Sequence, residues 1–332
     1  MSRVVVVTGA SAGVGRATVR RFAEAGDSIA LLARGQEGLA GARAEVEAAG
    51  ARAMTIPLDV ADAAAMDAAA ARVEAELGPI DVWVNNAMTA VLAPVVETTA
   101  EEFRRVTEVT YLGYVHGTLA ALRHMRPRDR GVIVQVGSGL AHRAIPLQAT
   151  YCGAKFAIRG FTDSLRCELI AEGSGIRVTM VQLPGLNTPQ FGWVKTTLSC
   201  HPRPVAPVYQ PEVAAQVIVW AAEHPRREIF VGGITPLLIW GSRVSPWLVD
   251  RYLARTNIEA QQTEIPLPEG HRSYLWDSLP GDHSAHGIFD DESHDTSRQL
   301  WLTMHRAPVA GATATLVAVG GLLRRRGRTA RR

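Results

Sequence analysis

A tyrosine and a lysine four residues apart offer the clearest chemistry in this sequence. Tyr151 and Lys155 fall in a stretch with helical periodicity, where this spacing places both side chains on one face. A nearby ammonium favours tyrosinate and lowers the pKa of a phenol, which suits a group that exchanges protons near neutral pH. Ser138, 13 residues earlier, adds a hydroxyl that can bind a substrate oxygen. An unrelated tyrosine and lysine are the alternative, but with six tyrosines and two lysines such a chance pair is rare.

A glycine-rich turn near the start of the chain indicates a second kind of site. It follows a β-branched run at residues 3–8 and precedes a helical pattern at about 14–25. Glycines allow close approach of the backbone to a ligand, and a helix N-terminus offers free N–H groups and a positive dipole end to a pyrophosphate. Such turns often only join a strand to a helix, but this position after the first strand favours nucleotide binding.

The end of the second predicted strand indicates which nucleotide. An acidic side chain there would bind the 2′-hydroxyl of NAD, but the sequence has Ala33 and Arg34. A guanidinium pairs well with a 2′-phosphate, so we expect NADP(H) rather than NAD. The alternative is an ordinary surface arginine in an arginine-rich chain.

Alternating elements must bring these residues together. Runs typical of buried strands lie at 3–8, 28–33, 52–57, 80–84, 132–136, 177–182 and 229–231. Helical patterns separate them at 14–25, 36–49, 62–77, 99–125, 149–172 and 211–223. This alternation predicts an α/β fold of the Rossmann type, with a doubly wound parallel sheet of about seven strands covered on both faces by helices.

Taken together, these motifs resemble the short-chain dehydrogenase/reductase family. The shared marks run from residue 4 to about 233 and include the turn from Thr8 to Gly15, Asp59-Val60, Asn85-Asn86-Ala87, Ser138, Tyr151, Lys155, Pro184-Gly185 and Thr188. The resemblance implies a single Rossmann-type domain and direct hydride transfer to or from a nicotinamide, without a metal.

The resemblance also implies a role for each matching residue. Tyr151 would be the general acid/base, Lys155 would bind the nicotinamide ribose and tune Tyr151, and Ser138 would orient the carbonyl. The implied cofactor contacts are Gly9, Ser11, Ala12, Gly13, Val14 and Gly15 at the pyrophosphate, Asp59 and Val60 at the adenine, Asn86 and Ala87 along the cofactor, Pro184 and Gly185 beside the nicotinamide, and Thr188 at its carboxamide.

Two positions depart from the family pattern. Met88 replaces a glycine that usually follows Asn-Asn-Ala, which implies a bulkier neighbour to the cofactor. Thr110 stands where the family has an asparagine that is thought to help hold a water in a proton relay to the lysine. A threonine hydroxyl also binds water, although it cannot copy an amide. With Ser138, Tyr151 and Lys155 intact, we still expect turnover and count Thr110 among the catalytic residues.

The expected reaction is NADP(H)-dependent hydride transfer involving a carbonyl or secondary alcohol. Phe191 and Trp193 lie in the family's variable substrate lid, between Pro184 and Pro211, and favour an apolar substrate. A non-catalytic nucleotide sensor or scaffold on the same fold is the alternative from another class. A loose group of His and Asp residues at 283–295 lacks metal-site spacing, so we expect no metal there.

The composition changes after the catalytic domain, which we place at residues 1–235. Residues 236–305 form an extended C-terminal appendage, in which 264–299 carry eight acidic and two basic side chains. Residues 306–332 form an apolar segment with an arginine-rich tail. The uncharged stretch 307–323 leaves three interpretations open: a membrane anchor or interfacial helix, a packing helix, or a disordered tail.

Composition limits the remaining classes. The 332 residues are 47% hydrophobic and 20% charged, which is typical of a globular protein. Six of the last nine residues are arginines; without them the chain has 29 basic and 32 acidic residues, so its basic character gives no evidence for nucleic-acid binding. Three cysteines cannot all pair, which predicts a reducing, cytoplasmic setting. The family resemblance implies a homo-oligomer, either a dimer or a tetramer.

Overall fold

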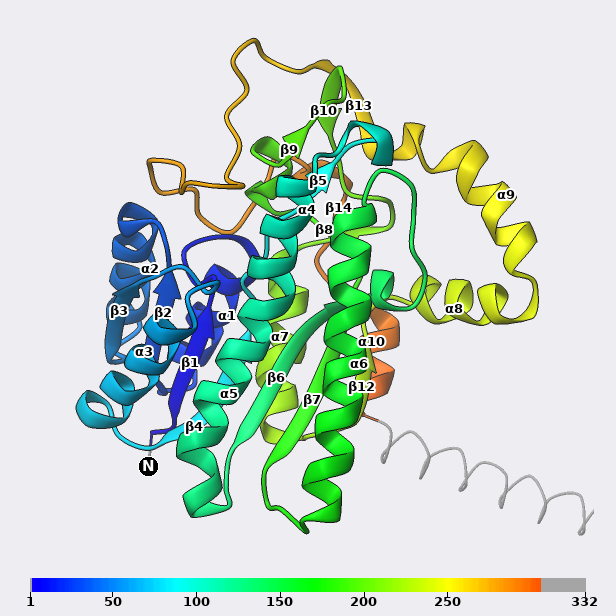
Figure 1. The fold of residues 1–332 in the computed structure, drawn as a ribbon. Helices are drawn as coiled ribbons and strands as arrows, with labels where there is room; N and C mark the ends of the chain where they lie inside the picture. The colour runs from blue at the N-terminus through cyan, green and yellow to red at the C-terminus, as the bar shows by residue number, and fades with distance from the viewer. Residues whose placement is uncertain (1, 306–332) are drawn as a thin grey trace, which may run out of the picture.

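The computed structural model describes residues 2–305, which form a central sheet with helices on both faces (Figure 1). The sheet has seven strands in the order β12-β7-β6-β4-β1-β2-β3, and every neighbouring pair is parallel. The strands are β1 Val4–Thr8, β2 Ser28–Ala33, β3 Ala53–Pro57, β4 Ile80–Asn85, β6 Val132–Ser138, β7 Arg177–Leu183 and β12 Glu228–Phe230. The winding direction reverses between β1 and β4, where such folds bind ligands. The predicted doubly wound Rossmann-type α/β fold is confirmed.

Strand β1 shows why the apolar runs are continuous. Val5 and Val7 pack into the core on one face of the sheet, and Val4 and Val6 pack into the core on the other. Helices α1 Gly13–Glu24, α2 Gln36–Ala48 and α7 Pro211–Glu223 cover the first face. Helices α3 Ala63–Glu76, α5 Gly113–Met125 and α6 Ala149–Ala171 cover the second. A strand with helices on both sides has no solvent face, so alternation between polar and apolar residues is lost.

The helix expected at residues 99–125 is not uniform. It consists of α4 Ala100–Val106, a π-helical segment Thr107–Leu112, and α5 Gly113–Met125. Helix α4 begins with a capping box, in which Thr99 and Glu102 each accept a hydrogen bond from the other's main-chain N–H. The π-helical segment is wider than an α-helix, and such segments often occur at functional sites.

The appendage predicted at residues 236–305 contains helices and strands that bond to the rest of the chain. Helices α8 Ile234–Val244 and α9 Pro246–Thr256 are followed by β13 Gln262–Pro266, β14 Ser293–His294 and α10 Arg298–Met304. Strand β13 pairs with β10 Cys200–Pro202, and β14 pairs with β11 Val208–Tyr209, which also pairs with β8 Gly185–Leu186. The extension is therefore bonded to the segment expected to cover the substrate.

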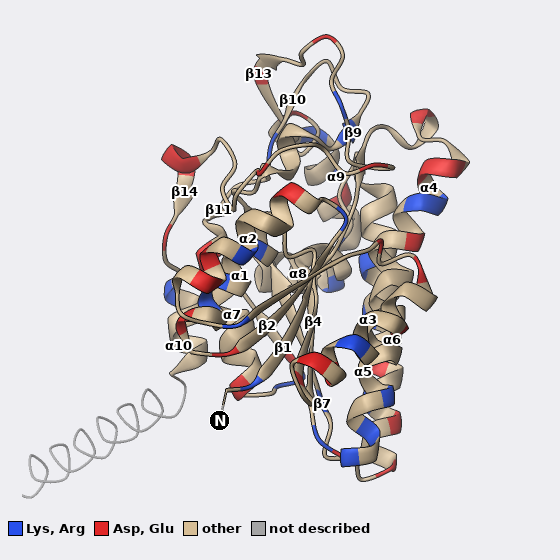
Figure 2. Cartoon of the chain, turned by 90° about the vertical axis from the view of Figure 1, so that its left-hand side faces the viewer, with Lys and Arg blue, Asp and Glu red and all other residues tan. Residues whose placement is uncertain are grey.

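Charged residues of both signs lie mainly on the outer helices and loops, whereas the strands of the sheet are largely uncharged (Figure 2). No helix within residues 2–305 is long and apolar enough to cross a membrane. The interpretations of the apolar segment and arginine tail at 306–332 concern a part of the chain outside the described residues.

Gly117 provides a test of packing in the core beneath the sheet. The amide of Asn85 accepts from Trp83 Nε1 at 2.8 Å and donates to Thr118 Oγ1 at 3.0 Å. A Cβ at Gly117 would lie 2.2 Å from Asn85 Oδ1, so Gly117→Ala must disturb this buried network. We expect it to lower the free energy of unfolding by about 1–3 kcal/mol in urea denaturation.

Gly160 in α6 is the matched control, because no atom lies within 4 Å of the Cβ that an alanine would place there. Gly160→Ala removes backbone freedom from a helix interior and should raise the free energy of unfolding by about 0.5–1 kcal/mol. Equal effects of the two variants would contradict this account of Gly117.

Candidate active site

One cavity of about 400 Å³ lies at the carboxyl ends of β1, β2, β4, β6 and β7. Parallel strands end at the same edge of the sheet, and this cavity lies around the switch point. The predicted site residues that line it are Gly9, Ser11, Ala12, Gly13, Val14, Arg34, Asp59, Val60, Asn86, Ala87, Ser138, Tyr151, Lys155, Pro184, Gly185 and Thr188. Gly15 and Thr110, the other two, do not line it.

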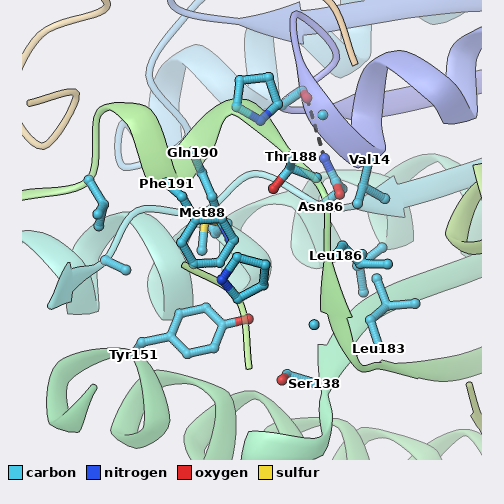
Figure 3. A pocket seen from close by; sticks show the side chains of 18 of the residues that line it. Val14, Asn86, Met88, Ser138, Tyr151, Leu183, Leu186, Thr188, Gln190 and Phe191 are labelled. Atoms are coloured by element: carbon cyan, nitrogen blue, oxygen red, sulfur yellow. Dashed lines mark hydrogen bonds between the residues drawn. The ribbon is translucent and has the colours of Figure 1, made fainter. Parts of the chain in front are cut away.

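Tyr151 and Ser138 face the same space within this cavity (Figure 3). Ser138 is the last residue of β6, and Tyr151 lies in the first turn of α6, so strand and helix bring the two hydroxyls together. Burial raises the pKa of the Tyr151 phenol, and a hydrogen bond with Ser138 offsets part of the rise. The expectation of a lowered phenol pKa is therefore wrong for the protein alone, because desolvation of the tyrosinate outweighs the other interactions.

Lys155 lies one helical turn after Tyr151, where it is buried and contributes to the lining of the cavity. Its Nζ donates to the Val136 carbonyl at 2.8 Å and to Tyr114 Oη at 3.1 Å. The amine also lies 5.4 Å from the centre of the Tyr151 ring. Burial lowers the pKa of Lys155 to about 7, and within residues 2–305 no carboxylate pairs with this amine.

Tyr114 is an unexpected partner of Lys155. It comes from α5, is almost fully buried, and donates its own hydroxyl to the same Val136 carbonyl at 2.8 Å. The phenol oxygen and the lysine amine thus share one acceptor and also bond to each other. Burial raises the pKa of Tyr114, so its hydroxyl stays protonated and its oxygen remains a neutral acceptor for the amine.

Thr110 has a different neighbour from the one expected. In the π-helical segment its Oγ1 donates to the Thr89 carbonyl at 2.7 Å and accepts from the Thr89 N–H at 2.9 Å. These two bonds tie the segment to the loop after β4 and engage the hydroxyl that was expected to hold a water. Thr110 therefore connects two backbones, while Tyr114 makes the contact with the lysine amine.

The glycine-rich turn is shaped by close approaches of backbone. Gly9 and Gly13 have φ values of +67° and +56°, which disfavour residues with a Cβ. A Cβ at Gly15 would lie 2.0 Å from the Gly9 carbonyl oxygen, so Gly15 closes the turn rather than lining the cavity. Asn86 joins the turn to the end of β4, since its Nδ2 donates to the Thr8 carbonyl at 2.9 Å.

Arg34 lies at the other end of the cavity, where it meets the C-terminal extension. Its guanidinium donates to the main-chain carbonyls of Tyr274 at 2.5 Å and Trp276 at 2.8 Å. An arginine has five N–H donors, and three of those on Arg34 have no hydrogen-bond acceptor within residues 2–305. Nearby, Arg105 pairs with Asp59 and donates to the Leu275 carbonyl at 3.0 Å, which adds another bond to the extension.

The extension also packs against the predicted lid. Phe191 and Trp193 line the cavity as expected. The Trp193 ring lies 4.3 Å from that of His283, centre to centre, and the Ser284 carbonyl accepts from the Gly13 N–H at 3.0 Å. Asp282, in the same part of the extension, pairs with the buried guanidinium of Arg16 at 3.0 Å and so ties the extension to α1.

Two phenols at this site, Tyr114 and Tyr274, match none of the motifs in the sequence. Tyr114 lies four residues after Thr110, on the helix that packs near Lys155. Its contact with Lys155 depends on how α5 and α6 pack together, which the spacing in the sequence does not give. Tyr274 comes from the extension, lines the cavity and contacts Met88 Sδ at 3.5 Å. No motif or spacing in the sequence predicts this position. Burial raises the pKa of Tyr274 to about 12.

The histidine-rich part of the extension makes ion pairs. His286 pairs with Glu212 at 3.0 Å and with Asp290 at 3.1 Å, and these carboxylates raise its pKa against the opposing effect of burial, the largest single influence. Across residues 2–305 no three His, Cys, Asp or Glu side chains are grouped as a metal site.

Known oxidoreductases resemble this chain in sequence. The family model described as short chain dehydrogenase matches residues 3–197. An uncharacterized oxidoreductase, YxnA, from Bacillus subtilis is 31% identical over 95% of this chain and 90% of its own length. A fatty acyl-CoA reductase from Acinetobacter baylyi is 31% identical over 68% of this chain and 75% of its own length.

A solved structure shows the same fold. The alcohol dehydrogenase from the archaeon Thermococcus sibiricus, complexed with 5-hydroxy-NADP, superposes with a TM-score of 0.61 and 25% identity, over 70% of this chain and 96% of that one. The family model covers more than half of the chain, and the relatives match in sequence well beyond the glycine-rich turn. This chain therefore belongs to the short-chain dehydrogenase family.

Proposed function

We propose that this short-chain oxidoreductase transfers a hydride between NADP(H) and a carbonyl or secondary alcohol of an apolar substrate. One observation carries the proposal: Tyr151, Ser138 and Lys155 meet in the same cavity as the glycine-rich turn. The cavity continues from these groups to Arg34 and Asp59, so it has residues suited to both ends of a dinucleotide. The nicotinamide supplies the hydride chemistry, and the protein supplies position and the proton.

The Tyr151 hydroxyl is placed to give a proton to a carbonyl oxygen in reduction and to take one from an alcohol in oxidation. Ser138 faces the same space and would hold that oxygen by a hydrogen bond. Lys155 would favour the tyrosinate and bind a ribose hydroxyl, while Tyr114 and the Val136 carbonyl hold its amine. Thr110 would act indirectly, by fixing the loop after β4.

The choice of NADP(H) is supported by the free donors of Arg34 at the end of β2. A guanidinium binds a phosphate by charge-assisted, often bidentate hydrogen bonds. Its hydrogen bond to a neutral 2′-hydroxyl is weaker, so Arg34 favours NADP(H) over NAD(H). The structural relative in complex with 5-hydroxy-NADP is consistent with this choice.

An apolar substrate is supported by the wall around Tyr151. Side chains there are mainly apolar: Met88, Leu92, Ile145, Leu186, Phe191, Trp193, Leu238, Ile239 and Leu253. Binding sites lined in this way gain affinity from burial of apolar ligand surface. The fatty acyl-CoA reductase among the relatives is named for a substrate with a long apolar chain. The division into residues 1–235 for catalysis, with 236–305 as an appendage, and a cytoplasmic homo-oligomer are part of the same proposal.

Removing the Tyr151 hydroxyl tests the chemistry. We expect Tyr151→Phe to lower kcat by about two orders of magnitude or more, because the general acid is lost. The Kd for NADPH, measured by fluorescence titration, should change little. Tyr274→Phe is the matched control, since Tyr274 is a second phenol in the same cavity and should be dispensable for proton transfer. Retained turnover in Tyr151→Phe would contradict the proposal. If the unaltered protein binds NADPH but reduces no carbonyl compound, the proposal is also contradicted, and a nucleotide sensor is favoured.

Arg34→Ala tests cofactor choice. We expect the ratio of kcat/KM for NADPH to that for NADH to fall at least roughly ten-fold, because charge-assisted hydrogen bonds to the phosphate are lost. Arg105→Met is the control: Arg105 also anchors the extension, at Leu275, but does not line the cavity. That variant should change both cofactors in parallel. A parallel change in Arg34→Ala as well would show that Arg34 only holds the extension.

Tyr114→Phe tests the pH dependence of the proton transfer. Loss of the phenol oxygen removes an acceptor of the charged amine, so the pKa of Lys155, about 7 in the unaltered protein, should fall further. With less ammonium at a given pH, Tyr151 ionises less readily. The acid limb of kcat/KM for alcohol oxidation should therefore move to higher pH, by about one unit.

Tyr111→Phe is the control for this experiment. Tyr111 packs against the same cluster as Tyr114, but none of its contacts is a hydrogen bond to Lys155. Its pH profile should match that of the unaltered protein. Coincident profiles for both variants would reduce Tyr114 to a packing role.

A further inference from the structure

Helices α8 and α9 present an apolar outer face that no other described element covers. Figure 1 shows the pair, in yellow, projecting from the body of the protein beyond α6. Leu237, Trp240 and Val244 are spaced along one face of α8. Trp247, Leu248 and Tyr252 follow on α9, and all six side chains are between 51% and 69% exposed. Isolated exposed apolar residues are normal, but a contiguous group of this size marks an interaction surface.

The opposite sides of the same helices belong to the active site. Leu238 and Ile239 of α8 and Leu253 of α9 line the cavity that holds Tyr151. Two adjacent helices thus contact the substrate space on one side and expose tryptophan on the other. Whatever binds the outer face therefore lies across these two helices from the cavity that holds Tyr151.

The charges on this surface distinguish between occupants. Residues 234–256 carry Arg243, Arg251 and Arg255 against a single acid, Asp250, which pairs with Arg143. The Arg251 guanidinium lies 5.0 Å from the centre of the Trp247 ring. An interface between two copies related by a two-fold axis would bring three arginines from each copy together with only one acid from each, and that acid already pairs with Arg143. Tryptophan, tyrosine and arginine around an apolar stripe suit the boundary between lipid headgroups and acyl chains.

We propose that the α8–α9 face docks on an anionic lipid surface and receives the apolar substrate from it. The inference deepens the proposed function, on which the delivery step rests, and names a lipid-dissolved ketone or alcohol as the substrate class. Docking inserts the six exposed apolar side chains among the acyl chains while the arginines meet the lipid phosphates. The substrate then moves between α8 and α9 into the cavity without crossing water.

Vesicle co-sedimentation of the full chain tests the docking surface. The probe is a vesicle of equal parts phosphatidylglycerol and phosphatidylcholine, and pure phosphatidylcholine is the comparison. Trp240→Ser/Trp247→Ser should reduce partitioning onto the mixed vesicles at least roughly ten-fold, because two large apolar side chains no longer insert. Trp301→Ser on α10 is the matched control, since Trp301 is 55% exposed at a different part of the surface, and should bind as the unaltered chain does.

The arginines give a second arm. Arg243→Gln and Arg255→Gln should each weaken binding to the mixed vesicles roughly five-fold and leave binding to pure phosphatidylcholine unchanged. Full binding by the double tryptophan variant would assign lipid contact to another segment and overturn the proposal. So would absence of binding by the unaltered chain, or a smaller oligomer of the tryptophan variant in analytical ultracentrifugation, which would make the occupant a second copy.

Turnover separates this proposal from the one on which it rests. A long-chain ketone dissolved in the vesicles should lose kcat/KM at least roughly ten-fold in the double tryptophan variant, in step with partitioning, whereas a short water-soluble ketone should not. Equal loss for both ketones would show damage to the cavity and overturn the delivery step. An unaltered chain that binds vesicles but reduces neither ketone contradicts the proposed function, while its vesicle binding still supports the lipid surface.

Discussion

The buried amine of Lys155 is the constraint on which the active-site arrangement depends. A cation without a carboxylate partner is costly to bury, and here two neutral oxygens, from the Val136 main chain and from Tyr114, accept its hydrogen bonds. Those oxygens come from β6 and α5, so the amine is fixed only when strand, helix and α6 are all packed together. The lowered pKa of Lys155 records this low-polarity setting, and the same burial raises the pKa of Tyr151.

The π-helical segment and Tyr114, which follows it, both contribute contacts near Lys155 and the loop after β4. The wider turn lets Thr110 bond to the Thr89 main chain in both directions, which anchors the loop after β4. Tyr114, one turn later, then lies beneath Lys155. Thr110 therefore fixes the loop after β4, and Tyr114 places a side-chain oxygen beside the Lys155 amine.

The cavity is lined both by the carboxyl edge of the sheet and by the C-terminal extension, which are far apart in the sequence. The extension's strands β13 and β14 pair with β10 and β11, and its main-chain carbonyls accept hydrogen bonds from Arg34. Helices α8 and α9 line the cavity on one side and expose apolar side chains on the other. The extension therefore connects Arg34, the cavity wall and the outer surface.

The sequence by itself determined the doubly wound sheet, because seven apolar runs alternate with helical patterns and strands buried on both faces need no polar alternation. It also determined that Ser138, Tyr151 and Arg34 share one sheet edge, since the ends of parallel strands meet there. Only the tertiary structure decided what surrounds them. Tyr114 reaches Lys155 because of how α5 is rotated against α6. Tyr274 reaches the cavity because the chain returns to it more than a hundred residues after Tyr151. The raised pKa of Tyr151 follows from burial, which depends on tertiary packing and not on local spacing.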